Sequence, residues 1–128
     1  MRALALALLV LGGCADETVS GYTDSDAVWR LIEMDGAPVT AEATLRFPAE
    51  GQVSGTGPCN GFTARQEVPY PWIAIEAIAS TRRACPDLAA ESAYFSALGK
   101  VSQAEVLGDV LILRGADGEE MVFRRDGG

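Results

Sequence analysis

The chain contains no histidine and only one lysine, Lys100, and these absences exclude much of enzyme chemistry. Without imidazole there is no Ser-His-Asp or Cys-His nucleophile system, and no zinc site with histidine ligands. General acid or base work falls to carboxylates, tyrosines, cysteines or Lys100. A Cys-x-x-Cys redox pair is also absent. The sequence therefore predicts no catalytic residue, no metal site and no cofactor.

Positive charge is scarce throughout the 128 residues, which carry 10 basic and 18 acidic side chains for a formal net charge of −8. This balance argues against a nucleic-acid partner, because binding to phosphates requires clustered lysine and arginine. It also argues against electrostatic docking on anionic lipid. We expect the acidity to serve solubility.

Long hydrophobic runs are absent apart from Ala3–Leu11, which follows the basic Met1-Arg2. The run is too short to span a bilayer and has the length of a signal-peptide core. The stretch Leu11-Gly12-Gly13-Cys14 then resembles a bacterial lipobox. We predict a signal peptide over residues 1–13 and lipid attachment, such as palmitate, to Cys14. The alternative is an ordinary secretory signal followed by an incidental cysteine.

Cleavage before Cys14 would leave a chain of formal charge −9, because only Arg2 is lost. Residues 14–27 are predicted to be the lipidated cysteine and a flexible acidic tether, and their acids lack the spacing of a calcium loop. The membrane contact is then the lipid on Cys14, and the location is the bacterial cell envelope. Ala15 after the cysteine resembles outer-membrane sorting, so the periplasmic face of that membrane is favoured where two membranes exist.

Cys59 and Cys85 are the two remaining cysteines. An even pair in an exported chain favours a structural disulfide. Two buried free thiols and a redox-active pair are the alternatives.

Residues 28–126 are predicted to form one small α+β domain, mostly an antiparallel sheet that curls toward a barrel, with one helix before the last strands. Turn signals at Asp35-Gly36 and Asp117-Gly118 separate the strands, while Pro69 and Pro71 exclude their segment from a central strand. The expected strands cover residues 28–33, 43–47, 52–55, 62–67, 72–75, 103–107, 110–114 and 120–125.

One helix is predicted from Pro86, in its first turn, to Gly99, with Val101 assigned to one further turn. Asp87 and Glu91 complement the positive helix start. The expected core-facing residues are Leu88, Tyr94, Phe95 and Leu98.

Two loops have unusual composition. The first, 55–61, has three glycines and an asparagine, but no Gly-Lys-Ser/Thr follows to support phosphate binding. The second, 80–87, carries Arg82 and Arg83 at the helix start. This arginine pair suggests either an anion site or pairing with the abundant acids, and we favour the pairing.

An early Trp29, then Gly57-Pro58-Cys59-Asn60, then Ala79-Ser80-Thr81 and Cys85-Pro86 stand in order before a helix and a final hairpin. This order resembles the META domain family, which includes the HslJ-type heat-shock lipoproteins. The chain departs from the family pattern at Gly61–Arg65 and in the Pro69–Pro71 insert. The family-motif residues here are Trp29, Gly57, Asn60, Ser80, Thr81 and Pro86.

The resemblance implies a small α+β domain, export, and a link to envelope stress, heat response or drug tolerance. It supplies no catalytic residue. The leading hypothesis is a non-catalytic envelope lipoprotein that binds or stabilises a protein partner. An alternative is an inhibitor of an envelope or foreign hydrolase that acts through Tyr70 and Trp72, although we favour the interpretation that these rings cover the core. A thiol-redox protein using Cys59 and Cys85 is the third reading.

Overall fold

A computed structural model describes residues 15–127, so the predicted signal peptide and Cys14 lie outside the described range. The described chain forms nine strands, one α-helix and a short 3-10 helix, with the helix between the sixth and seventh strands. The elements are η1 (Val19–Tyr22), β1 (Trp29–Met34), β2 (Ala37–Pro38), β3 (Thr44–Ala49), β4 (Gly51–Thr56), β5 (Gly61–Gln66), β6 (Glu76–Ser80), α1 (Leu88–Leu98), β7 (Val101–Leu107), β8 (Val110–Gly115) and β9 (Glu120–Arg125).

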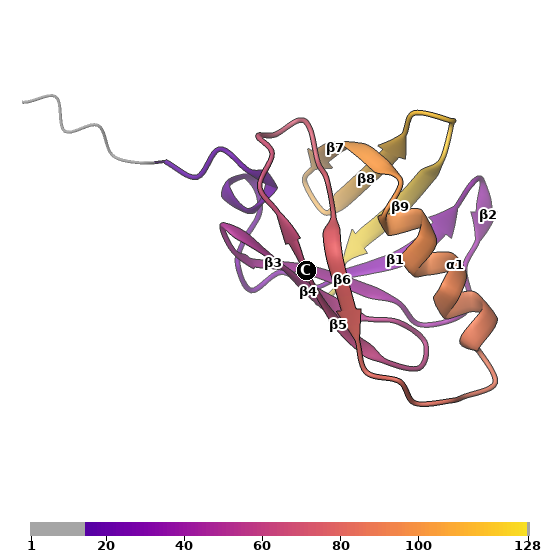
Figure 1. The fold of residues 1–128 in the computed structure, drawn as a ribbon. Helices are drawn as coiled ribbons and strands as arrows, with labels where there is room; N and C mark the ends of the chain where they lie inside the picture. Colours follow the sequence, from indigo (N-terminus) through magenta and orange to yellow (C-terminus); the bar gives the residue numbers. More distant parts are fainter. Residues whose placement is uncertain (1–14, 128) are drawn as a thin grey trace, which may run out of the picture.

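All strands belong to one antiparallel sheet with the order β6-β5-β4-β3-β1-β9-β8-β7, while β2 pairs with β1 outside this path. The turn between β1 and β2 uses Asp35 and Gly36 at φ of 51° and 81°, the conformation that the Asp-Gly signal predicts. The sheet curls into a half-barrel, with α1 at one side of it (Figure 1). The predicted α+β class, the curled sheet and the single helix are confirmed.

The segment before β6 connects the two ends of the half-barrel by hydrogen bonds to β7. Ile73 N donates to Ser102 O at 3.0 Å, Ala104 N donates to Pro71 O at 2.8 Å, and Trp72 forms an isolated bridge with Gln103. The strand predicted at residues 72–75 is therefore wrong, because the regular strand begins at Glu76. Ile73 and Ile75 are buried, as their alternation predicts, but burial alone does not specify a continuous ladder.

Inward-facing residues of the strands and one face of α1 form the core, in which the fully buried large side chains include Trp29, Leu45, Phe47, Tyr94, Leu98 and Phe123. Tyr94 packs against the rings of Phe62 and Phe123, and its hydroxyl donates to Thr44 O at 2.7 Å. Burial raises the pKa of this hydroxyl far above its ordinary value, so Tyr94 remains a neutral donor.

Two expectations for the helix need correction. Leu88 was predicted to face the core but is 42% exposed, because it begins the helix at the rim. Glu91 lies in the first turn of the helix, as predicted, and its side chain is also buried. Val101 begins β7 rather than a further helical turn, since the helix ends at Leu98. Among residues 15–127, no helix is long and apolar enough to cross a membrane.

The segment predicted as a flexible tether is ordered from Asp16 onward in a way that the sequence does not indicate. Thr18 and Val19 are buried, and Tyr70 N donates to Glu17 O at 2.8 Å. Asp16 Oδ1 accepts a hydrogen bond from Thr18 N at 2.8 Å and Asp16 Oδ2 accepts one from Ser20 Oγ. The prediction fails here because Val19 is buried in the core and Tyr22 stacks on Tyr70, although most of the segment is polar.

Candidate binding groove

A buried pair, Asn60 and Glu91, joins the two unusual loops to the helix. Their exposed fractions are 3% and 4%. Asn60 N and Asn60 Nδ2 donate to the Glu91 carboxylate at 2.6 and 2.7 Å, and Cys59 N donates to it at 3.1 Å. Hydrogen bonds to a charged acceptor are the stronger kind, so this carboxylate fixes loop 55–61 against α1.

Asn60 also binds the second loop. Its Oδ1 accepts hydrogen bonds from Arg83 N at 2.6 Å and from Thr81 Oγ1 at 3.0 Å, and its Nδ2 donates to Arg83 O at 3.0 Å. One side chain therefore holds loop 55–61, loop 80–87 and α1 together. The buried polar groups of Asn60 are fully engaged in this structural role.

Loop 55–61 presents backbone N–H groups to an anion, and the anion is the protein's own Glu91 carboxylate. A Cβ on Gly57 would lie 2.5 Å from Glu91 Oε1, so glycine leaves the room that this carboxylate needs. The phosphate-binding interpretation of the loop is therefore not supported.

Cys59 and Cys85 form a disulfide with a Cα–Cα distance of 5.7 Å, which confirms the predicted pairing. The bond joins the same two loops as Asn60. Covalent and hydrogen-bonded connections thus fix one local geometry.

An open groove of about 320 Å³ lies between the end of β6, loop 80–87 and the first turns of α1. Phe95 contributes an apolar wall, and Arg82, Arg83 and Leu88 line the same groove. Both arginines are exposed, and neither forms an ion pair within residues 15–127. The expected pairing of these arginines with acids is therefore wrong, and within the described chain two unpaired cations lie at the groove.

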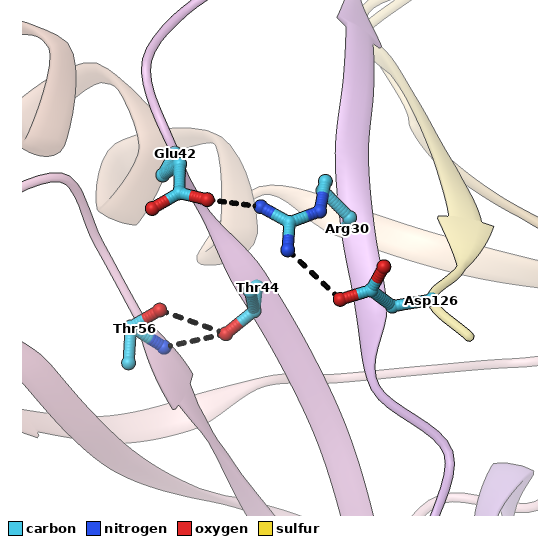
Figure 2. Close-up of polar contacts among 5 residues, drawn as sticks. All are labelled: Arg30, Glu42, Thr44, Thr56 and Asp126. Carbon is cyan, nitrogen blue, oxygen red and sulfur yellow. Dashed lines mark hydrogen bonds and ion pairs between the residues drawn. The ribbon is translucent and has the colours of Figure 1, made fainter.

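Arg30 shows the contrasting arrangement on β1. Its guanidinium contacts Glu42 and lies 2.8 Å from Asp126 Oδ2, while Thr44 and Thr56 bond to each other on the neighbouring strands (Figure 2). Hydrogen bonds and charge from Asp126 and Glu42 raise the pKa of Arg30. Arg30 therefore connects β1 to Asp126, which follows β9, and to Glu42, and it is not free to bind an anion.

The sequence profile of the META domain family matches residues 23–128, which is most of the chain. The chain belongs to the META domain family. No functionally curated protein matches it.

Solved structures share the fold. A protein from Burkholderia xenovorans, solved by NMR, is 22% identical and superposes with a TM-score of 0.66, covering 80% of this chain and 83% of its own. A DUF4847 family protein from Bacteroides vulgatus is 11% identical with a TM-score of 0.68, covering 83% and 96%. At these identities the likeness shows the fold alone.

The structure places the motif residues of this META domain in different settings. Asn60, Ser80 and Thr81 line the groove, whereas Gly57 lies against Glu91. The disulfide joins the two loops beside it, and Pro86 precedes the helix. Trp29 lies apart in the core, and its Nε1–H has no acceptor among residues 15–127, so its role is packing.

Sequence reasoning missed the position of Glu91. Its spacing from Tyr94 and Leu98, three and seven residues, already places it on their helix face. Tyr70 and Trp72, the predicted partner surface, lie outside the groove. Tyr70 is half-buried against Tyr22, whereas Trp72 is exposed.

Proposed function

We propose that this META domain is a non-catalytic envelope protein, held at the membrane by lipid on Cys14, that binds a protein partner in the groove beside α1. Membership of the META domain family supports an envelope-associated, non-catalytic role. The finer steps depend on the lipobox-like sequence and on the groove. We also propose that the role is linked to envelope stress or drug tolerance, as the resemblance implies.

The observation that carries the binding role is the free arginine pair beside a rigid wall. Arg82 and Arg83 have no ion-pair partner among residues 15–127 although the chain is strongly acidic, and Leu88 and Phe95 add apolar surface. The disulfide and Asn60 fix the groove in advance, which lowers the ordering cost of binding. The partner chemistry that fits is an acidic segment with an apolar side chain.

A catalytic role for the groove is disfavoured by the use of its buried polar groups. Glu91 accepts three N–H donors from loop 55–61, and Asn60 uses both ends of its amide. Neither residue has a free group aimed at a substrate.

Photo-crosslinking in intact cells tests the groove. A photoreactive residue at Ser92, which lines it, should trap one reproducible protein, and the Arg82→Glu, Arg83→Glu double variant should reduce that product severalfold. Arg46→Glu is the matched control, because Arg46 is an exposed arginine of β3 that forms no ion pair in the described chain. Equal losses in both variants would contradict the proposal.

Metabolic labelling with a fatty-acid analogue tests the anchor. Label should appear on the wild-type chain and be absent from Cys14→Ala. Label that persists without Cys14 would refute attachment at this residue.

Inhibition of an envelope or foreign hydrolase is the second candidate, favoured by the exposed Trp72. Aromatic anchors on rigid loops are typical of inhibitor contacts. Wild-type protein should inhibit a member of a protease and lysozyme panel, and Trp72→Ala should weaken that inhibition. No inhibition across the panel would remove this candidate.

A further inference from the structure

We infer that the face around Trp72 is a lipid-contacting surface, seated on the membrane to which Cys14 ties the chain. The inference rests on the proposed lipid anchor and adds an orientation to it. It assigns a role to aromatic side chains that the groove does not use.

The aromatic face consists of Tyr22, Tyr70, Trp72 and Leu107. The rings of Tyr22 and Tyr70 stack with centroids 4.2 Å apart, and the Tyr70 hydroxyl accepts a hydrogen bond from Val106 N at 3.0 Å. Trp72 pairs with Gln103 on the same strand, β7, which Leu107 ends. Tyr22, Trp72 and Leu107 are 53%, 53% and 55% exposed, although they are large apolar residues.

The loop that carries Tyr70 and Trp72 is rigid. The buried side chain of Gln66 donates to Val68 O at 2.7 Å and accepts from Ala74 N at 3.0 Å, so it holds both limbs of the loop. Trp72 N donates to Pro69 O at 2.9 Å within it. The exposed indole is therefore presented by a fixed backbone.

The anchor point lies beside this face. Glu17 O accepts a hydrogen bond from Tyr70 N at 2.8 Å, which fixes Glu17 to the loop. Glu17 is three positions after Cys14, and three extended residues span at most about 11 Å. Lipid on Cys14 would therefore hold the aromatic face close to the bilayer.

The chemistry of the face suits a zwitterionic lipid surface. Tyrosine and tryptophan prefer the membrane interface, where the ring is buried and the polar atom remains hydrated. Glu17, Glu50 and Glu67 line a hollow next to Ala15, so this end of the protein would repel anionic headgroups. We expect contact with phosphatidylcholine to exceed contact with phosphatidylglycerol at low salt.

The orientation leaves the binding groove accessible. Figure 1 shows the N-terminal segment and α1 on opposite sides of the molecule. A domain seated on its aromatic face would therefore present the groove beside α1 away from the attachment point. Membrane contact and partner binding are compatible.

The two tryptophans make the test direct, because Trp29 is buried and Trp72 is exposed. Residues 15–127 contain every strand of the sheet and its core, so a chain that begins at Cys14 retains the folded unit. With Cys59 and Cys85 in the disulfide, Cys14 is the one free thiol for coupling to a maleimide lipid in phosphatidylcholine vesicles. This coupling makes the test independent of lipidation in cells.

The Trp29→Phe variant reports Trp72 alone, and it loses no hydrogen bond because the Trp29 indole N–H has none in the described chain. Its emission should shift to the blue on coupling and be quenched by brominated acyl chains. The Trp72→Phe variant, which reports Trp29, is the matched control and should show neither effect. Replacing phosphatidylcholine by phosphatidylglycerol should weaken the quenching at low salt.

Unchanged Trp72 emission in coupled protein, with the same acrylamide accessibility as in uncoupled protein, would overturn the inference. A different outcome is acrylamide quenching of Trp72 that is weaker at higher protein concentration, with no quenching by brominated lipid. That result would assign the face to a second copy of the chain. Protection of Trp72 from acrylamide that appears only when a cell protein is crosslinked to the chain would assign the face to a protein partner. Failed fatty-acid labelling in cells would refute the proposed anchor. The vesicle experiment does not depend on that labelling, so it still tests whether the aromatic face contacts lipid.

Discussion

At the scale of single residues, Glu91 carries a charge inside the protein and is satisfied by the chain itself. Its carboxylate meets backbone N–H groups of Cys59 and Asn60 and the side-chain amide of Asn60. A buried carboxylate is stable only with such donors. The loop composition that suggests a ligand site thus serves an internal acceptor.

The Glu91→Gln substitution should destabilise the protein by about 2 kcal/mol, because a charge-assisted bond is lost and the new amide N–H group faces a donor of Asn60. Urea unfolding measured by fluorescence gives the change in the free energy of unfolding. Glu50→Gln is the control, since Glu50 is exposed and should change stability by less than about 0.5 kcal/mol. Equal effects of the two substitutions would contradict the buried role of Glu91.

The stability of the protein is expected to depend on pH through Asp16 in the N-terminal segment. Burial raises the pKa of its carboxyl, but hydrogen bonds from Ser20 and Thr18 outweigh this, and the pKa lies below the ordinary 3.8. A carboxyl group whose pKa is lower in the folded state stabilises the folded protein at pH values above its unfolded-state pKa. That stabilisation is lost as the pH falls through the folded-state pKa. Wild type should therefore exceed Asp16→Asn in stability near neutral pH, and the difference should shrink below about pH 4.

The comparison is made by urea unfolding of both proteins at a series of pH values. A difference that persists undiminished at the lowest pH would show that Asn perturbs the segment by another route.

At the scale of elements, β6 combines a register shift with a positive backbone φ. It forms one edge of the ordered sheet path, its pairing with β5 shifts between Thr63 and Arg65, and Ala77 adopts φ of 55°. The left-handed region is unfavourable for a residue with a Cβ. The shift in register and the strained alanine occur together at the start of this strand.

Glycine substitutions in β6 should have opposite signs at two positions. Ala77→Gly should stabilise by up to about 1 kcal/mol, because it removes the cost of positive φ. Ala79→Gly, two residues along the same strand, should destabilise by about 0.5–1 kcal/mol through backbone entropy. The two variants are compared by thermal unfolding. Equal destabilisation of both would disprove the strain at Ala77.

At the scale of the whole molecule, the disulfide encloses β5, the segment that closes the half-barrel, and β6. Cys59 and Cys85 are 26 residues apart. Loop-closure entropy over this separation corresponds to about 3.5 kcal/mol of stabilisation. In a domain this small, that is a large share of the total stability.

The Cys59→Ala, Cys85→Ala double variant should therefore lose about 3–4 kcal/mol and unfold at a clearly lower temperature. Cys14→Ala in the same chain is the control and should leave the unfolding of residues 15–127 unchanged. A double variant as stable as wild type would show that Asn60 and Glu91 hold the loops without the covalent bond.

The sequence by itself determined the α+β class, most strands, the helix and the family, because alternation, turn residues and motif spacing can be read along the chain. It favoured a Cys59–Cys85 disulfide because these are the two cysteines besides Cys14. It also supplied the predicted anchor at Cys14, which lies outside the described residues. Local patterns record which residues avoid water and where the chain turns.

Only the tertiary structure decided the rest. It placed Glu91 under loop 55–61, left Arg82 and Arg83 free, and attached Val19 and Tyr22 to the sheet beside Tyr70. It also replaced the strand expected at residues 72–75 by a short bridge to β7. Each outcome depends on contacts between residues far apart in the chain, and such contacts follow from how the sheet curls rather than from any local pattern.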